Sequence, residues 1–145
     1  TEIKNEIAEE VRGCFDNLAN SFDKRGYNVE AKYRDFEVEL VPQRIIIDID
    51  AEMTLTKTGE TSKEENFRVV IPSRIYDLSI VSQEIVSQEA KFCNFETVGF
   101  MLLYPDFKIE RFTTGDLNKI YTITHKKTRE KFKFAVRGCV IPPGF

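Results

Sequence analysis

Hydrophobic residues near the amino terminus recur every three or four positions, the spacing that places side chains on one side of a helix. They are Ile3, Ile7, Val11, Cys14, Phe15, Leu18 and Phe22. The spacing predicts an amphipathic helix over residues 2–24, and Gly26 can adopt the left-handed conformation that ends a helix. Gly13 within the helix suggests a close approach of another element.

After Gly26 the hydrophobic period falls to two, the period of a strand with one buried face. The alternating runs are Val29, Ala31 and Tyr33; Phe36, Val38 and Leu40; Ile45, Ile47, Ile49, Ala51, Met53 and Leu55; and Phe67, Val69 and Ile71. The intervening positions carry Glu37, Glu39, Asp48, Asp50, Glu52 and Thr54, which predict a solvated sheet face. A polar loop at residues 58–62 predicts that the last two runs pair as a hairpin.

A second helical period follows Pro72, with Ser73 placed to cap a helix of residues 75–90. Residues 95–104 fit a short helix or a strand, and we favour the helix. The remaining runs predict strands near residues 107–109, 120–123 and 132–136. The two prolines in Val140–Phe145 exclude a central strand there, because proline lacks a ladder donor.

These elements predict an α+β fold. We expect an antiparallel β-sheet of about six to seven strands in a meander with hairpins, and an N-terminal amphipathic helix and a second central helix packed on one face. A chain of 145 residues with 41% hydrophobic residues can build one ordinary core, so we predict a single domain over residues 1–145. No run approaches the roughly 20 apolar residues of a membrane span.

The charge balance argues against nucleic acid as a partner. The formal net charge is −3, whereas phosphate binding needs clustered positive charge. Residues 126–133 do combine five basic residues with Phe132. RNA binding is therefore a weak alternative, and the polar side of a hairpin is the simpler explanation.

Three cysteines are separated by 79 and 46 residues, which fits no zinc or redox motif. We expect either one disulfide between two of Cys14, Cys93 and Cys139 in an oxidising compartment, or three buried and inert cysteines. We predict no metal site and no cofactor.

The sequence offers few groups for catalysis. The one histidine, His125, lies beside a turn, where a surface position is the common case. Asp48, Asp50 and Glu52 share a strand face, which suits calcium binding or acid–base chemistry but equally a solvated surface. No glycine-rich phosphate loop occurs. We therefore expect a protein that is not an enzyme.

A pocket between the helices and the sheet is the alternative, and it would serve a small ligand or an enzyme substrate. The candidate lining residues are Phe100, Met101, Tyr104 and Tyr121. All four also suit an ordinary hydrophobic core.

Several stretches carry a resemblance to a known family. They are Ile7–Cys14 with Arg25–Tyr27, Phe67–Pro72, Ile75–Glu89, Ile120–Thr124 and Phe132–Arg137. Together they resemble uncharacterised archaeal proteins of small-genome lineages that have an amino-terminal membrane anchor and an outward-facing region. The resemblance implies a place at the cell surface and no particular activity.

The chain begins with Thr1 rather than Met, so it is either a processed product or a fragment, and a signal peptide or a membrane anchor could have preceded it. The leading hypothesis is a non-enzymatic extracellular or cell-envelope domain that acts by protein contact or self-association, including as a filament subunit. Membrane attachment would come only through the missing amino-terminal anchor. A cytoplasmic location is the alternative.

Overall fold

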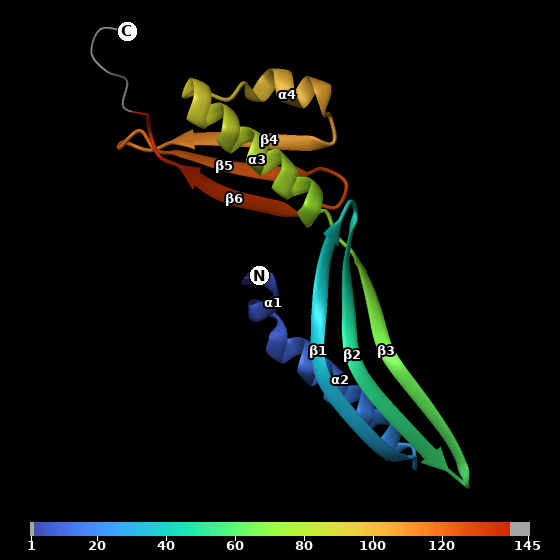
Figure 1. Ribbon diagram of the computed structural model, residues 1–145. Coiled ribbons are helices and arrows are strands. Elements are labelled where there is room, and N and C mark those ends of the chain that lie inside the picture. Colours follow the sequence, from blue (N-terminus) through green and yellow to red (C-terminus); the bar gives the residue numbers. More distant parts are fainter. Residues whose placement is uncertain (1, 140–145) are drawn as a thin grey trace, which may run out of the picture. The chain divides into compact units, whose positions relative to one another are not determined.

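A computed structural model describes residues 2–139. The described chain divides into two compact units. The first runs to Leu40 and continues from Ile45 to Ile71, and the second contains Val41–Arg44 and the chain from Pro72 onward. Each unit combines helices with a three-stranded antiparallel sheet (Figure 1).

The first unit contains two helical segments and a sheet of order β1-β2-β3. The elements are α1 (Glu2–Glu6), α2 (Ala8–Lys24), β1 (Asn28–Val41), β2 (Arg44–Lys57) and β3 (Glu60–Pro72). The predicted helix of residues 2–24 is thus present, with an interruption at Ile7.

The predicted hairpin between β2 and β3 is present, but its loop is shorter than the expected residues 58–62. Thr58 and Gly59 have φ values of 51° and 81°, and a two-residue turn with positive φ at both positions suits the twist of paired strands. As a result β3 begins at Glu60, and polar residues that we assigned to the loop belong to the strand.

The core of the first unit lies between α2 and the sheet. Its buried members are Val11, Phe15, Phe36, Ile47, Ile49, Ala51 and Met53. The four β2 members alternate along the strand, as the period of two predicted. Gly13 has no atom within 4 Å of the position of a Cβ, so the expected close approach is wrong.

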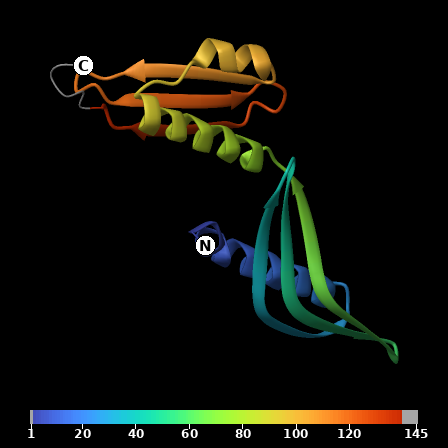
Figure 2. The same cartoon turned by 45° about the horizontal axis from the view of Figure 1, so that its top comes forward.

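The second unit contains two helices and a sheet of order β4-β5-β6 (Figure 2). The elements are α3 (Ile75–Phe92), α4 (Thr97–Leu103), β4 (Phe107–Thr113), β5 (Lys119–His125) and β6 (Lys131–Val136). Ile109 pairs with Ile123, and Tyr121 pairs with Phe134, so these side chains share one sheet face. The helical interpretation of residues 95–104 and the three predicted strands are confirmed.

The second core lies between that sheet face and the helices. Its buried members are Leu78, Val81, Ile85, Phe95, Ile109, Tyr121 and Ile123. Phe100 and Met101 of α4 pack against the same cluster. Both helices of the unit therefore contribute apolar side chains to one core.

The α+β class with antiparallel strands is confirmed, but the single sheet of six to seven strands is wrong. The six strands form two separate sheets, each with its own buried cluster. Alternation along a strand shows which of its faces is buried, but it does not show which other strands pair with it. The sequence therefore could not assign the strands to two sheets. The single domain stays a prediction. Residues Val140–Phe145 lie outside the described part of the chain.

Candidate functional site

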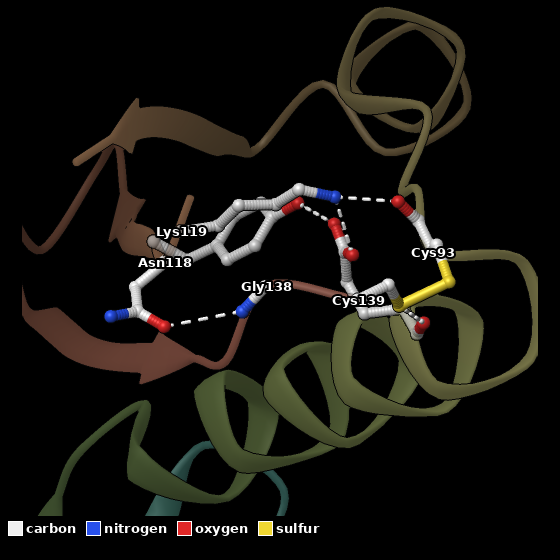
Figure 3. Close-up of a disulfide and its surroundings, with 7 residues drawn as sticks. Cys93, Asn118, Lys119, Gly138 and Cys139 are labelled. Carbon is white, nitrogen blue, oxygen red and sulfur yellow. Dashed lines mark hydrogen bonds and ion pairs between the residues drawn. A yellow bond between two sulfur atoms is a disulfide. The ribbon is translucent and has the colours of Figure 1, made fainter. Parts of the chain in front are cut away.

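A disulfide joins Cys93 to Cys139, with 5.7 Å between their Cα atoms. Cys93 ends α3 in the left-handed conformation, and Cys139 follows the last strand of the second unit. The bond therefore links the end of the helix to the segment that leaves the sheet (Figure 3). Cys14 is a free, exposed thiol, so three buried cysteines are excluded.

The segment before Cys139 fits tightly against the turn between β4 and β5. The Gly138 amide donates to Oδ1 of Asn118 at 3.2 Å. A Cβ on Gly138 would lie 2.6 Å from the carbonyl oxygen of Leu117, closer than van der Waals contact allows. Gly138 is thus a site of close backbone approach.

Beside the disulfide, a carboxylate is enclosed by the fold. The Glu89 side chain comes from α3 and the whole residue is 2% exposed. Lys119 Nζ donates to Glu89 Oε2 at 2.7 Å and to the Cys93 carbonyl at 2.6 Å, and the Tyr121 hydroxyl donates to Glu89 Oε1 (Figure 3). Both carboxylate oxygens therefore have a partner, which a buried charge requires.

The environment of Tyr121 shifts its ionisation. Burial raises the pKa of the Tyr121 phenol to about 12, and the hydrogen bond to the Glu89 carboxylate acts in the same direction. Arg111 acts in the opposite sense with a smaller effect. The phenol stays neutral at physiological pH and serves as a hydrogen-bond donor.

His125 is buried, with 3% exposure, so the expected surface position is wrong. Its Nδ1 lies 3.0 Å from Oγ1 of Thr128, and its ring meets Phe107 edge to face with centroids 5.6 Å apart. The ring packs on the core side of the sheet because residues 121, 123 and 125 alternate inward. These contacts give His125 a structural role at the start of the β5–β6 turn.

Glu130, in the β5–β6 turn, bonds the start of α3. Its Oε2 accepts from the Ser73 hydroxyl at 2.7 Å and from the Arg74 amide at 2.8 Å. Burial raises the pKa of Glu130, but these hydrogen bonds, one from Thr128 and the charge of His125 together lower it. Ser73 accepts from the Ile75 amide at 3.2 Å, but the N-cap position of α3 is Arg74, so the predicted capping by Ser73 is wrong by one residue.

The three carboxylates that share a face of β2, those of Asp48, Asp50 and Glu52, are paired with arginines. Asp48 accepts two hydrogen bonds from Arg68 at 2.6 and 2.9 Å. Arg34 bonds Asp50 at 2.9 Å and Glu52 at 3.4 Å. Within residues 2–139, no group of three or more His, Cys, Asp and Glu side chains is arranged to hold a metal ion. The row is a set of surface ion pairs.

The predicted ligand-binding residues separate into two groups. The rings of Phe100 and Tyr104 are in tilted contact, with centroids 4.7 Å apart, and line a groove of about 970 Å³ between α3 and α4. Tyr121 is fully buried in the core, and Met101 packs on it, where its sulfur accepts from the Ile109 amide at 3.2 Å. The structure thus places two of the four at an accessible surface.

Large apolar side chains are exposed on several elements of the described chain, including β3 and α4. On β3, an edge strand, Val69, Val70 and Ile71 are each 41–49% exposed. On α4, Val98, Leu102 and Leu103 are 60–79% exposed. Within residues 2–139 no helix is both long and apolar enough to cross a membrane.

Sequence reasoning missed Glu89 and Lys119. A signal for Glu89 was present, because it continues the four-residue spacing of Val81 and Ile85 on the apolar stripe of α3. A carboxylate at such a position predicts a buried partner. Nothing in the sequence identified Lys119 as that partner.

Comparison of the chain with protein-family models, curated proteins and solved structures found no match.

Proposed function

We propose that this chain is a non-enzymatic domain of the cell surface or exterior that acts by protein contact, in particular with further copies of itself. The observation that carries the proposal is the exposed edge strand β3, on which Val69, Val70 and Ile71 remain uncovered. An edge strand has backbone N–H and C=O groups without ladder partners, so it can accept a strand from another chain.

The composition of β3 favours pairing at one end of the strand. Its first half carries charges at Glu60, Lys63, Glu64 and Glu65, which protect an edge. Its second half, residues 67–71, has Arg68 as its one charged residue. Pairing is therefore expected over residues 67–71.

The disulfide supports a location outside the cytoplasm. Disulfides persist in oxidising compartments and are rare where glutathione and thioredoxin keep thiols reduced. The Cys93–Cys139 bond lies next to the enclosed Glu89, so an oxidising compartment would preserve that arrangement. The resemblance to anchored archaeal proteins implies the same location.

The partners of the titratable groups support a non-enzymatic role. Every buried side-chain nitrogen and oxygen among residues 2–139 has a hydrogen-bond partner. His125 bonds Thr128, and Glu130 bonds the start of α3. These groups are engaged in holding the fold, whereas a general base needs access to a substrate proton.

The location can be tested with the exposed thiol of Cys14. A membrane-impermeant maleimide added to intact source cells should label the protein, and a Cys14→Ser variant should not be labelled. Labelling that requires cell lysis would contradict a surface location.

Self-association can be tested by sedimentation over a range of concentrations. We expect Val70→Lys to abolish association, because a lysine on an edge strand opposes pairing. Thr61→Lys is the matched control at the charged end of the same strand and should associate normally. A chain that stays monomeric at millimolar concentration would contradict the proposal.

The groove between α3 and α4 favours a second candidate function, the binding of a small apolar ligand. Its lining contains Phe100, Tyr104 and Phe107 and, from α3, polar side chains that include Asp77 and Glu84. A ligand would therefore find both apolar contacts and hydrogen-bond partners there. Tyr104→Ala should weaken binding of an anilinonaphthalene dye, measured by fluorescence, whereas Phe112→Ala should not. Equal effects of the two substitutions would exclude the groove.

A further inference from the structure

The short helix α4, whose N-cap is Glu96, presents an apolar surface along its length. The segment from Thr97 to Pro105 contains no charged residue. Leu102 and Leu103 are 79% and 77% exposed, and Val98 lies one helical turn before Leu102, on the same side of the helix. Large apolar surfaces of this kind mark interaction sites.

The inner side of α4 is fixed, so this exposure is a stable feature of the fold. Phe100 and Met101 pack on the second core, and Phe95, 1% exposed, anchors the loop that precedes the helix. Arg111 donates to Oδ1 of Asn94 at 2.9 Å and to the Phe95 carbonyl at 3.3 Å. The Cys93 disulfide holds the start of the same loop.

Two lysines lie at the carboxyl end of α4. The turn that follows the helix meets the β5–β6 turn, where the Lys126 amide donates to the Asp106 carbonyl at 2.8 Å. Lys126 Nζ donates to the Pro105 carbonyl at 2.6 Å. Lys127, whose side chain is 76% exposed, is 3.4 Å from Asp106. Figure 1 shows the two turns at the same end of the β4–β6 sheet.

The second unit as a whole is also positively charged. The second unit contains 12 basic and 8 acidic residues, a net charge of +4, and the first contains 9 and 16, a net charge of −7. The apolar helix therefore belongs to the positively charged part of the chain. A neutral or basic protein surface would gain nothing from these lysines, whereas an anionic one would.

We propose that α4 docks on an anionic lipid bilayer, with Val98, Leu102 and Leu103 in the interfacial region and Lys126 and Lys127 against the lipid phosphates. Apolar side chains beside lysines, with a tyrosine at the boundary, are typical of interfacial membrane contacts. Tyr104, which ends the helix, supplies that tyrosine. This contact goes beyond the protein contact proposed above and uses a different unit of the chain.

The test is co-sedimentation of the 145-residue chain with vesicles of phosphatidylcholine containing 30% phosphatidylglycerol. We expect binding that weakens in pure phosphatidylcholine and at high salt. Leu102→Ser should weaken binding roughly tenfold or more, and Phe112→Ser, which changes an exposed aromatic residue of β4, should leave it unchanged. Neutralising Lys126 and Lys127 to Gln should cost roughly fivefold each on anionic vesicles, and Lys32→Gln should cost nothing.

Three outcomes would overturn the proposal. The first is no sedimentation with either vesicle. The second is an equal loss for Leu102→Ser and Phe112→Ser. The third is a Leu102→Ser variant that loses self-association without any vesicle binding, which would assign α4 to a protein partner. Val70→Lys should bind vesicles normally, so failure of self-association through β3 is distinguishable from failure of this proposal.

Discussion

Within residues 2–139 each unit buries seven hydrophobic residues in its core, but the two units differ in the burial of their polar side chains. In the first unit the carboxylates of β2 remain on the solvated face and pair with Arg34 and Arg68. In the second unit the Glu89 carboxylate is enclosed, and its partner Lys119 also bonds the carbonyl of the disulfide-linked Cys93.

The difference indicates which polar contacts contribute most to the stability of the fold. Exposed ion pairs compete with water and are weakened by salt, so they add little to stability. A buried carboxylate must keep every partner, so a loss of one partner is costly. We therefore expect the first unit to tolerate changes of its polar side chains and the second unit to depend on them. Hydrogen exchange measured by mass spectrometry reports on each unit separately.

The largest expected effect is that of Glu89→Ala. It leaves Lys119 and the Tyr121 hydroxyl without their partner and should destabilise the second unit by about 3 kcal/mol. This is the lower end of the usual range, because the Lys119 side chain keeps 18% of its surface exposed. Exchange should accelerate in β5 and α3 and not in β2. Glu84→Ala, on the exposed side of the same helix, is the control, and equal effects of the two variants would contradict the comparison.

Loss of the disulfide should have the next largest effect. Cys139→Ser opens a loop with a sequence separation of 46 and should cost about 2–4 kcal/mol, because it releases chain entropy in the unfolded state. The first unit contains only the free thiol of Cys14 and should be unaffected. Denaturant unfolding with and without reductant checks this expectation. A native chain that reductant does not weaken would refute it.

Stability of the second unit should fall at alkaline pH. The pKa of Tyr121 is raised to about 12 in the fold, whereas an exposed phenol titrates near 10. The unfolded chain then loses this proton first, so the contribution is complete below about pH 10 and disappears as pH rises through 12.

Tyr121→Phe isolates this contribution. It should cost about 1–2 kcal/mol at neutral pH through the lost hydrogen bond to Glu89. The difference in unfolding free energy between native and variant chains should shrink between pH 10 and 12. A difference that is constant with pH would contradict the assignment.

A smaller effect is expected where the chain passes the β4–β5 turn. Gly138→Ala places a Cβ 2.6 Å from the Leu117 carbonyl oxygen and should cost about 1–2 kcal/mol as the segment shifts. Gly115→Ala, with nothing within 4 Å of its Cβ position, should be neutral. Thermal unfolding of the two variants measures the difference, and identical melting temperatures would disprove the close approach.

The smallest effect belongs to the first unit. Arg68 lowers the pKa of Asp48 mainly by hydrogen bonding, but the pair is exposed. Asp48→Asn should change stability only slightly, and the change should vanish in 1 M salt because of screening. A large loss of unfolding free energy that persists in 1 M salt, measured by denaturant unfolding, would show that this exposed ion pair contributes as much as the buried Glu89.

The sequence predicted individual helices and strands better than it predicted contacts between residues far apart in the chain. The period of α2, the alternation along β2 and the helix of residues 97–103 followed from hydrophobic spacing. The burial of His125 was missed because we placed it beside a turn, although it continues the inward alternation of Tyr121 and Ile123 along β5. Glu130 illustrates the same limit, since its partners at Ser73 and Arg74 are more than 50 residues away.

The sequence by itself determined the α+β class and the order of most helices and strands, because periodicity is a local property. Only the tertiary structure decided that the strands form two sheets, that Cys93 pairs with Cys139, that Lys119 and Tyr121 enclose Glu89, and that α4 has its apolar side exposed. Each of these depends on which distant segments meet, and that choice is made by packing of whole elements.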